Sequence, residues 1–269
     1  MKKLIVLVTL LFVAVIGASA SPMCVNGGTL ASYQGLALGG CFYNDLFLSN
    51  FNYSVSGVGS TVPGGSQGIA NTAVAVKLVN NGVGGVGLDF SGAFNLNGVS
   101  TSASNTITYT ITYTVAAPVS YFKGVSAVVL NASVDTENTG TLSAISFSKS
   151  LKNGTGCTGT YAACGGLLAT SPSLNVALND PTNNATPVTS PSLSLLKNPF
   201  STGLTYSTLY INDQLTLTAS KNAGPTVKGN AQITDMENFF VVPEPGTGLL
   251  GGSIGLGLIL LSRLRRKKT

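Results

Sequence analysis

The chain has 269 residues and a formal net charge of +5, and it contains no histidine. Without histidine, the sequence excludes Ser-His-Asp and Cys-His nucleophilic arrangements and every metal site with an imidazole ligand. The positive charge lies at the two ends, since residues 4–262 hold seven lysines against all nine acidic residues. No basic patch remains there for DNA or RNA, so we expect no nucleic-acid partner.

The first 20 residues have the pattern of a secretory signal peptide. Lys2 and Lys3 begin the segment, residues 4–17 are apolar apart from one threonine, and Ala18 and Ala20 form an A-x-A cleavage site. The apolar run is short for a membrane span, which argues against an uncleaved anchor helix. We therefore expect export across the inner membrane and cleavage after Ala20.

The chain has four cysteines, and an exported chain meets an oxidising compartment in which cysteines pair. None of them has the C-x-x-C spacing of a zinc site. Four cysteines allow three connectivities, and we favour the pairing of sequence neighbours, Cys24–Cys41 and Cys157–Cys164. Each short loop would then stabilise the fold by about 2–3 kcal/mol on the chain-entropy model.

Residues 21–241 are expected to form one extracellular all-β domain, an antiparallel β-sandwich or jelly roll. The clearest strand is Thr106–Val115, where threonines alternate with apolar or aromatic residues. Alternation over ten residues indicates a sheet with one buried face. Further apolar or β-branched runs, separated by Gly, Asn and Asp, predict strands at Ala73–Val79, Val86–Phe90, Tyr121–Leu130, Leu142–Phe147, Leu209–Ile211 and Gln214–Ala219.

The threonines of Thr106–Val115 stand about 6.7 Å apart on one face. An ice-binding plane would need several stacked rows of this kind, and the sequence does not repeat the period, so we interpret the row as a solvent-facing surface. Sugar binding would use aromatic platforms. The apolar face of this strand holds Tyr109 and Tyr113 in the core, which leaves as candidates Tyr33, Tyr43, Tyr53, Tyr161 and Tyr206.

Residues 171–199 hold five of the eleven prolines among Ser, Thr and Asn. Proline cannot donate to a strand ladder, so this composition predicts a long surface loop or an extended excursion rather than central strands. Strand-like sequence continues on both sides, and we do not place a domain boundary here.

Asp135 and Glu137 lie two residues apart and would share one face of a strand. Glycosidases take their two carboxyls at a defined separation, and the sequence does not place a second one here. The stretch 135–140 is more typical of a polar hairpin loop, with calcium ligation and catalysis as the alternatives. The G-x-G-x-x-G at residues 82–87 is followed by strand-like sequence with no acidic residue about 20 positions on, so we expect no dinucleotide cofactor.

Residues 242–269 contain three elements in order. Pro243, Glu244 and Pro245 interrupt the preceding strand, and residues 246–262 form an apolar run near the lower length limit of a transmembrane helix. A basic cluster that would stay cytoplasmic follows, at Arg263, Arg265, Arg266, Lys267 and Lys268. The domain is then outside and the tail inside, and these properties leave open whether the tail is kept or removed.

This order of elements resembles the PEP-CTERM sorting signal of Gram-negative bacteria. The resemblance covers residues 242–269 and implies a processing partner, an exosortase, which is a membrane-embedded cysteine protease that recognises the motif at residues 243–245 and removes the tail. It also implies association with exopolysaccharide, biofilm matrix or the outer surface.

These features together predict an exported protein of the cell surface or exopolysaccharide matrix, with a non-catalytic structural, adhesive or glycan-associating role. We expect no catalytic residues, cofactor or metal. The expected partners are an exosortase-type protease, extracellular polysaccharide, and the membrane through the C-terminal helix. The alternatives are a secreted carbohydrate-active enzyme that uses carboxylates and a calcium-stabilised binding module.

Overall fold

The computed structural model describes residues 22–36, 39–57, 68–80, 85–97, 104–117, 122–136, 143–153, 174–180, 187–199, 206–220 and 229–242. The signal segment with Ala18 and Ala20, the Cys157–Cys164 pair and the tail from Pro243 onward lie outside these residues. What we expect of them therefore stays a prediction. Within the described residues, no helix is long and apolar enough to span a bilayer.

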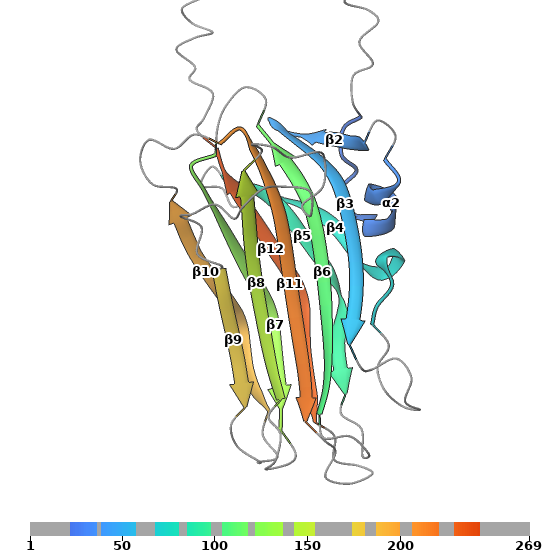
Figure 1. Ribbon diagram of the computed structural model, residues 1–269, viewed down its shortest axis with the longest axis vertical. Coiled ribbons are helices and arrows are strands. Elements are labelled where there is room, and N and C mark those ends of the chain that lie inside the picture. The colour runs from blue at the N-terminus through green and yellow to red at the C-terminus, as the bar shows by residue number, and fades with distance from the viewer. Residues whose placement is uncertain are drawn as a thin grey trace, which may run out of the picture.

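The described chain forms two six-stranded antiparallel sheets that face each other as a β-sandwich (Figure 1). Sheet I has the order β1 (Gly28–Thr29), β4 (Ala75–Asn80), β5 (Gly85–Asn97), β12 (Asn230–Val241), β7 (Gly124–Asp135) and β10 (Val188–Pro199). Sheet II has the order β2 (Gly40–Tyr43), β3 (Leu46–Gly57), β6 (Ser104–Ala116), β11 (Thr208–Ser220), β8 (Ser143–Asn153) and β9 (Leu174–Asp180). The predicted all-β class is confirmed.

The core lies between the sheets and follows the period-2 alternation of the strands. On β6 the predicted division is confirmed, because Ile107, Tyr109, Ile111, Tyr113 and Val115 are all buried. Tyr113 is the centre of an aromatic cluster whose rings come from both sheets, with centroids 5.6 Å from Phe51 and Phe90 and 6.3 Å from Phe240. Edge-to-face and stacked contacts of this kind add about 0.5–1.5 kcal/mol each beyond their burial.

The buried side of β12 changes partway along the strand, and this change decides which of its side chains enter the core. Ile233 is buried, and the register with β5 shifts between Ile233 and Asp235, where β5 has one residue more than β12. The register with β7 continues without a shift. Such a bulge disrupts the ladder locally. Beyond it Met236, Asn238 and Phe240 are buried, whereas Asp235 and Glu237 belong to the outer face.

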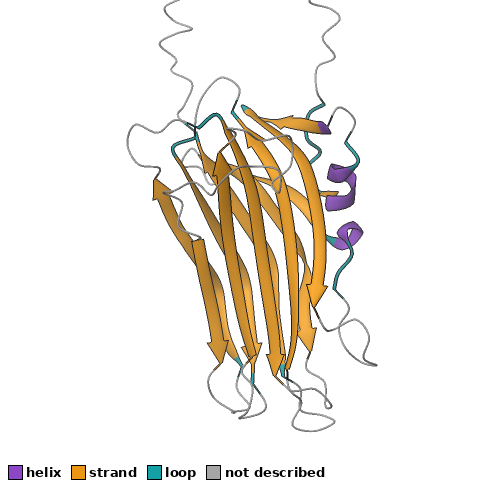
Figure 2. Cartoon of the chain, viewed as in Figure 1, coloured by secondary structure: helices purple, strands orange, loops and turns teal. Residues whose placement is uncertain are grey.

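Two short helices lie beside β3 and β4 at one edge of the sandwich (Figure 2). The first, α2 (Leu30–Gln34), begins with Thr29 as its N-cap, whose hydroxyl accepts a hydrogen bond from the Ser32 amide. Leu30 and Tyr33 are buried against the core. The second is a single 3₁₀ turn, η2 (Asn71–Ala73).

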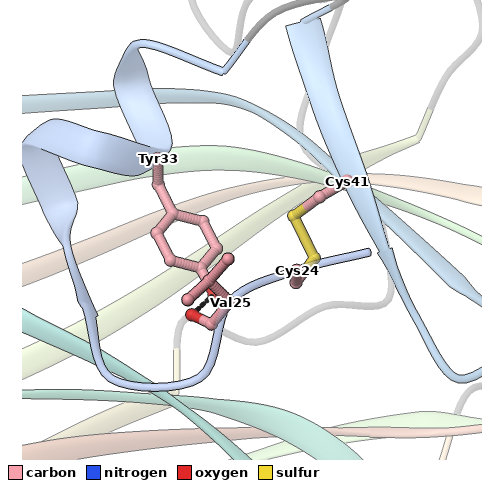
Figure 3. The surroundings of a disulfide bond; sticks show 4 residues. All are labelled: Cys24, Val25, Tyr33 and Cys41. Atoms are coloured by element: carbon pink, nitrogen blue, oxygen red, sulfur yellow. Dashed lines mark hydrogen bonds between the residues drawn. A yellow bond between two sulfur atoms is a disulfide. The ribbon is translucent and has the colours of Figure 1, made fainter. Parts of the chain in front are cut away.

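A disulfide between Cys24 and Cys41 fixes the N-terminal segment to β2, and this part of the predicted pairing is confirmed (Figure 3). The two Cα atoms are 4.9 Å apart. Beside it, the Tyr33 hydroxyl donates a 2.9 Å hydrogen bond to the Val25 carbonyl. Both contacts hold the segment before α2 against the sandwich.

Three local predictions are wrong. Residues 171–199 are not a long loop, because they contain the edge strands β9 and β10. Proline is tolerated there since an edge strand has one side without ladder bonds. The predicted strands Leu209–Ile211 and Gln214–Ala219 are one strand, β11. Finally, the segment after Asp135 is not a hairpin, because it connects β7 in sheet I to β8 in sheet II.

Candidate functional site

The outer face of sheet II carries hydroxyl and amide side chains over four neighbouring strands. We call this surface the hydroxyl face. Its members are Asn52, Ser54 and Ser56 on β3, Thr106, Thr108, Thr110 and Thr112 on β6, Asn212, Gln214, Thr216 and Thr218 on β11, and Ser146, Ser148 and Ser150 on β8. Along the described part of these strands, Lys152 is the one charged residue on this side.

The strand register aligns these side chains in rows across the sheet. Thr108 lies beside Ser56 on one side and Thr216 on the other, and Thr216 lies beside Ser146. The Thr108 and Thr216 hydroxyl oxygens are 3.2 Å apart, and those of Thr106 and Thr218 are 3.3 Å apart. Cross-strand Thr pairs contribute about 0.2–1 kcal/mol each. The single threonine row expected from the sequence is thus one of several hydroxyl-bearing rows, although the twist of a sheet rotates successive strands out of one plane.

Aromatic side chains lie at one end of this surface. Phe47 is aligned with Ala116 on β6 and with Phe42 on β2, and the two phenyl rings are 5.0 Å apart and half-buried. Of the tyrosines named as sugar platforms, Tyr33 is buried, and the Tyr53 hydroxyl is already engaged with the Ile69 carbonyl at 2.6 Å. Tyr43 and Tyr206 are half-buried, and Tyr161 lies outside the described residues.

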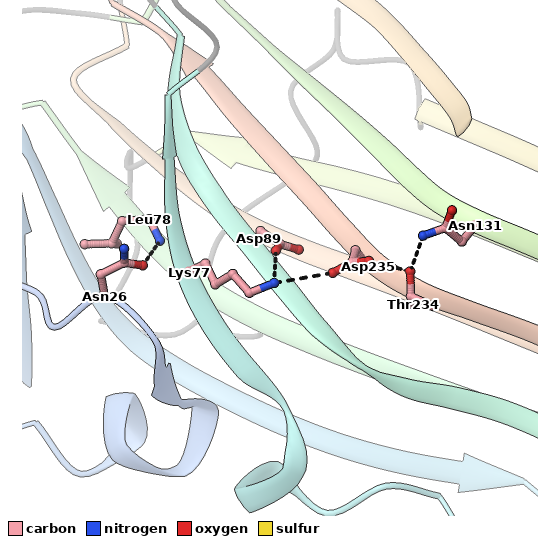
Figure 4. Close-up of polar contacts among 7 residues, drawn as sticks. All are labelled: Asn26, Lys77, Leu78, Asp89, Asn131, Thr234 and Asp235. Atoms are coloured by element: carbon pink, nitrogen blue, oxygen red, sulfur yellow. Dashed lines mark hydrogen bonds and ion pairs between the residues drawn. The ribbon is translucent and has the colours of Figure 1, made fainter. Parts of the chain in front are cut away.

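A cluster of acidic residues lies on the opposite, outer face of sheet I (Figure 4). The Lys77 ammonium is 3.3 Å from the Asp89 carboxylate and 3.8 Å from that of Asp235. Thr234 donates to Asp235, and Asn131 donates to Thr234 at 2.8 Å. We call Lys77, Asp89, Asp235 and Glu237 the outer acidic cluster.

Burial raises the pKa of Asp89 to about 6, and the charge of Asp235 acts in the same direction, while Lys77 opposes both. Burial also raises the pKa of Glu237. The Asp89 carboxyl can therefore exchange a proton near neutral pH, but a half-exposed lysine already occupies the space between two of the carboxylates.

The carboxylate pair expected from the sequence is not assembled by the described chain. Asp135 ends β7, its carbonyl accepts a hydrogen bond from the Ser143 hydroxyl, and Glu137 lies outside the described residues. The described part of the chain contains no group of three or more acidic or cysteine side chains placed to hold a metal ion. The strand expected after the glycine motif is β5, which already begins at Gly85, within the motif.

A third polar cluster lies inside the core, and the sequence prediction missed it. The Lys149 ammonium on β8 is 2.7 Å from the Asp213 carboxylate on β11, 2.7 Å from the Asn238 side-chain carbonyl on β12, and 3.3 Å from the Tyr113 hydroxyl. Tyr113 donates to the second Asp213 oxygen at 3.1 Å. Lys149, Asp213 and Asn238 are at most 1% exposed. We call these four residues the core polar cluster.

Burial dominates the electrostatics of this cluster. It lowers the pKa of Lys149 and raises the pKa of Asp213, and the attraction between the two residues opposes both shifts. The Lys149 nitrogen also lies 5.6 Å and 5.8 Å from the ring centroids of Tyr113 and Phe240. Cation–π contacts at this distance favour the charged amine, although they do not replace its hydration.

No protein-family model matches the chain, and no curated protein sequence matches it. Among solved structures, it is similar to the CBM22-1 xylan-binding domain of Paenibacillus barcinonensis Xyn10C, with 11% identity over 71% of this chain and 87% of that one, at a TM-score of 0.23. The xylan-binding module CBM15 gives 10% identity over 70% and 97% of the two chains, at a TM-score of 0.24. At such low scores these likenesses do not bear on what this chain binds.

Proposed function

We propose that this chain is an exported protein of the cell surface or exopolysaccharide matrix, whose sandwich associates with glycans through the hydroxyl face and turns over no external substrate. The observation that carries the proposal is the uncharged, hydrogen-bonding surface formed by β3, β6, β11 and β8. Hydroxyl and amide groups can donate to and accept from sugar hydroxyls, and the half-buried Phe42 and Phe47 add an apolar end.

Export is supported separately from glycan binding. The Cys24–Cys41 disulfide fits an oxidising compartment, and the signal-like first 20 residues and the PEP-CTERM-like tail fit delivery to the surface. We propose that an exosortase-type protease processes the tail and that the C-terminal helix holds the chain in the membrane until then. The intact mass of the protein from its native host tests this scheme. Losses near Ala20 and near Pro245 are expected, whereas a retained tail contradicts removal by an exosortase.

Glycan association is tested by co-sedimentation of the full chain, kept in detergent, with cellulose, chitin and the exopolysaccharide of the native host. Two exposed glutamines form a matched pair, since Gln214 belongs to the hydroxyl face and Gln232 to the outer face of sheet I. Gln214→Ala is expected to weaken binding about five-fold, the equivalent of about one hydrogen bond. Gln232→Ala should bind as the unaltered chain does.

Two results overturn the proposal. If both glutamine variants bind equally well, the glycan does not contact the hydroxyl face. If none of the polysaccharides retains the protein, the glycan-associating role is wrong. Polysaccharide turnover that disappears in Asp89→Asn would instead place a catalytic carboxyl in the outer acidic cluster, in favour of the carbohydrate-active enzyme.

A further inference from the structure

The core polar cluster places an amine, a carboxamide and a carboxyl in contact with one another, on three strands that belong to both sheets. Lys149 on β8 and Asp213 on β11 are directly opposite each other in sheet II, and Asn238 enters from β12 in sheet I. We propose that Lys149 and Asn238 form an intramolecular amide bond that links the two sheets covalently, with Asp213 as its acid–base catalyst.

The geometry brings the nucleophile close to the carbon that it must attack. The Lys149 nitrogen is 2.7 Å from the Asn238 side-chain oxygen. A carbonyl bond is about 1.23 Å long, so the nitrogen cannot be further than about 3.9 Å from the carbonyl carbon. Reacting atoms in productive arrangements are about 3–3.5 Å apart. A small rotation of the lysine side chain is therefore enough to reach that distance.

The surroundings favour the neutral form of the Lys149 amine, which is the form that reacts. The burial that lowers the pKa of Lys149 and raises the pKa of Asp213 favours transfer of a proton from the amine to the carboxyl. The Asp213 carboxylate is 2.7 Å from that amine, so the transfer needs no intervening water. The neighbouring rings of Tyr113 and Phe240 keep the site apolar.

Each atom in the step is accounted for. The Lys149 ammonium gives one proton to Asp213, and the resulting amine attacks the Asn238 carbonyl carbon. The protonated Asp213 donates to the carbonyl oxygen as the tetrahedral intermediate forms. A second proton then passes from the attacking nitrogen to Nδ2, and the Cγ–Nδ2 bond breaks so that ammonia leaves. As the carbonyl re-forms, its hydroxyl proton returns to Asp213, which ends the reaction protonated. The product is a secondary amide, and no oxidant, metal or other reactant takes part.

The unreacted cluster also contains an unsatisfied group that the reaction removes. Asn238 Nδ2 is buried and makes no hydrogen bond within the described part of the chain, although the amide lies close enough to Asp213 to lower the pKa of that carboxyl. A buried donor without a partner costs about 1–3 kcal/mol. Formation of the bond expels this nitrogen as ammonia and replaces a buried ammonium by a neutral amide.

Mass spectrometry of the full chain tests the proposal directly. Trypsin cuts after Lys123, Lys149, Lys152 and Lys228, but an acylated Lys149 resists it. The unaltered protein should therefore yield peptide 124–152 joined to the peptide that begins at Gly229, with a mass about 17 Da below their sum because ammonia is lost. Free peptide 124–149 as the main product of the folded protein overturns the proposal.

Three substitutions assign the roles of the residues. Asn238→Ala should abolish the joined peptide, and Asn238→Asp should restore the same product with loss of water, about 18 Da, in place of ammonia. Asp213→Asn should slow the reaction by on the order of 100-fold or more, since it removes the acid–base group. A joined peptide that instead contains the segment ending at Lys221 would place the bond on Asp213 and overturn its assignment to Asn238. Because the unaltered protein provides the primary result, a variant that fails to fold does not prevent the test.

Discussion

The chain contains two Lys–Asp pairs with the same backbone relationship and opposite environments. Lys149 faces Asp213 across β8 and β11, and Lys77 faces Asp89 across β4 and β5, each pair being directly opposed in an antiparallel ladder. The inner pair is fully buried with a nitrogen–oxygen distance of 2.7 Å, whereas Lys77 is 51% exposed and lies 3.3 Å from Asp89.

The two pairs behave differently because water reaches the outer lysine and not the inner one. The outer lysine remains a hydrated cation, and its contact with Asp89 raises its pKa. Burial lowers the pKa of the inner lysine despite a shorter contact with its aspartate. The same two residue types thus form an ordinary surface ion pair at one site and a potential nucleophile with its proton acceptor at the other.

The largest expected difference between the pairs is the cost of removing the lysine. Lys149→Ala leaves Asp213 buried without its partner and also removes the proposed bond to Asn238, so we expect the free energy of unfolding to fall by at least about 3–5 kcal/mol. Urea denaturation followed by circular dichroism measures this loss. A loss below about 1 kcal/mol would mean that water reaches the core polar cluster.

Replacing both inner residues with apolar ones should recover much of that loss. Buried ion pairs exchanged for hydrophobic residues of similar volume are often neutral or stabilising, by about 1–4 kcal/mol. We therefore expect Lys149→Met with Asp213→Leu to unfold at a higher urea concentration than Lys149→Ala alone. If the double variant is no more stable than the single one, lost packing rather than an unpaired charge explains the single variant.

The contribution of the outer pair to stability should depend on pH. The pKa of Asp89 is about 6 in the folded chain and 3.8 without its surroundings, so the folded state binds this proton more tightly. Its contribution to stability is full below about pH 4 and is lost as the pH rises through about 6. The melting temperature of the unaltered chain should therefore fall relative to that of Asp89→Asn between pH 4 and pH 7. Parallel curves for the two proteins would contradict the raised pKa.

The smallest effect is expected from Lys77→Ala. Exposed ion pairs contribute about 0.2–1 kcal/mol and are screened by salt. The variant should lose less than about 1 kcal/mol at low ionic strength, and the difference should shrink in about 1 M salt. A salt-independent loss would show that Lys77 acts through the packing of its stem instead.

Much of the fold could be predicted because strand patterning is local. The alternation in Thr106–Val115 gave the two faces of β6 correctly, although Thr114, which was expected to face solvent, is buried and accepts a hydrogen bond from Asn50. Asn212 and Asp213, however, have the composition of a turn, which split β11 into two predicted strands. The prediction for residues 171–199 was wrong for a related reason, since proline excludes a central strand but not an edge strand.

One feature of the sequence points to the core polar cluster, although the overall composition of the strands does not reveal it. Ile145, Phe147, Lys149 and Leu151 alternate on one face of β8, so a lysine occupies an apolar position, and Asp213 does the same on β11. Asn238 could not be placed this way, because the buried side of β12 changes near Thr234. That these strands meet in one place depends on the pairing of the two sheets, which no local pattern specifies.

The position of β12 determines how a pull on the tail would reach the domain. The strand lies inside sheet I with ladder bonds to both β5 and β7, and it leads directly to residue 242. Tension applied beyond that residue would load both ladders in shear, so that many hydrogen bonds must fail together rather than one after another. Asn238 lies three residues before the end of this strand. A covalent bond there would pass the force into β8 of the second sheet before the ladders could slide.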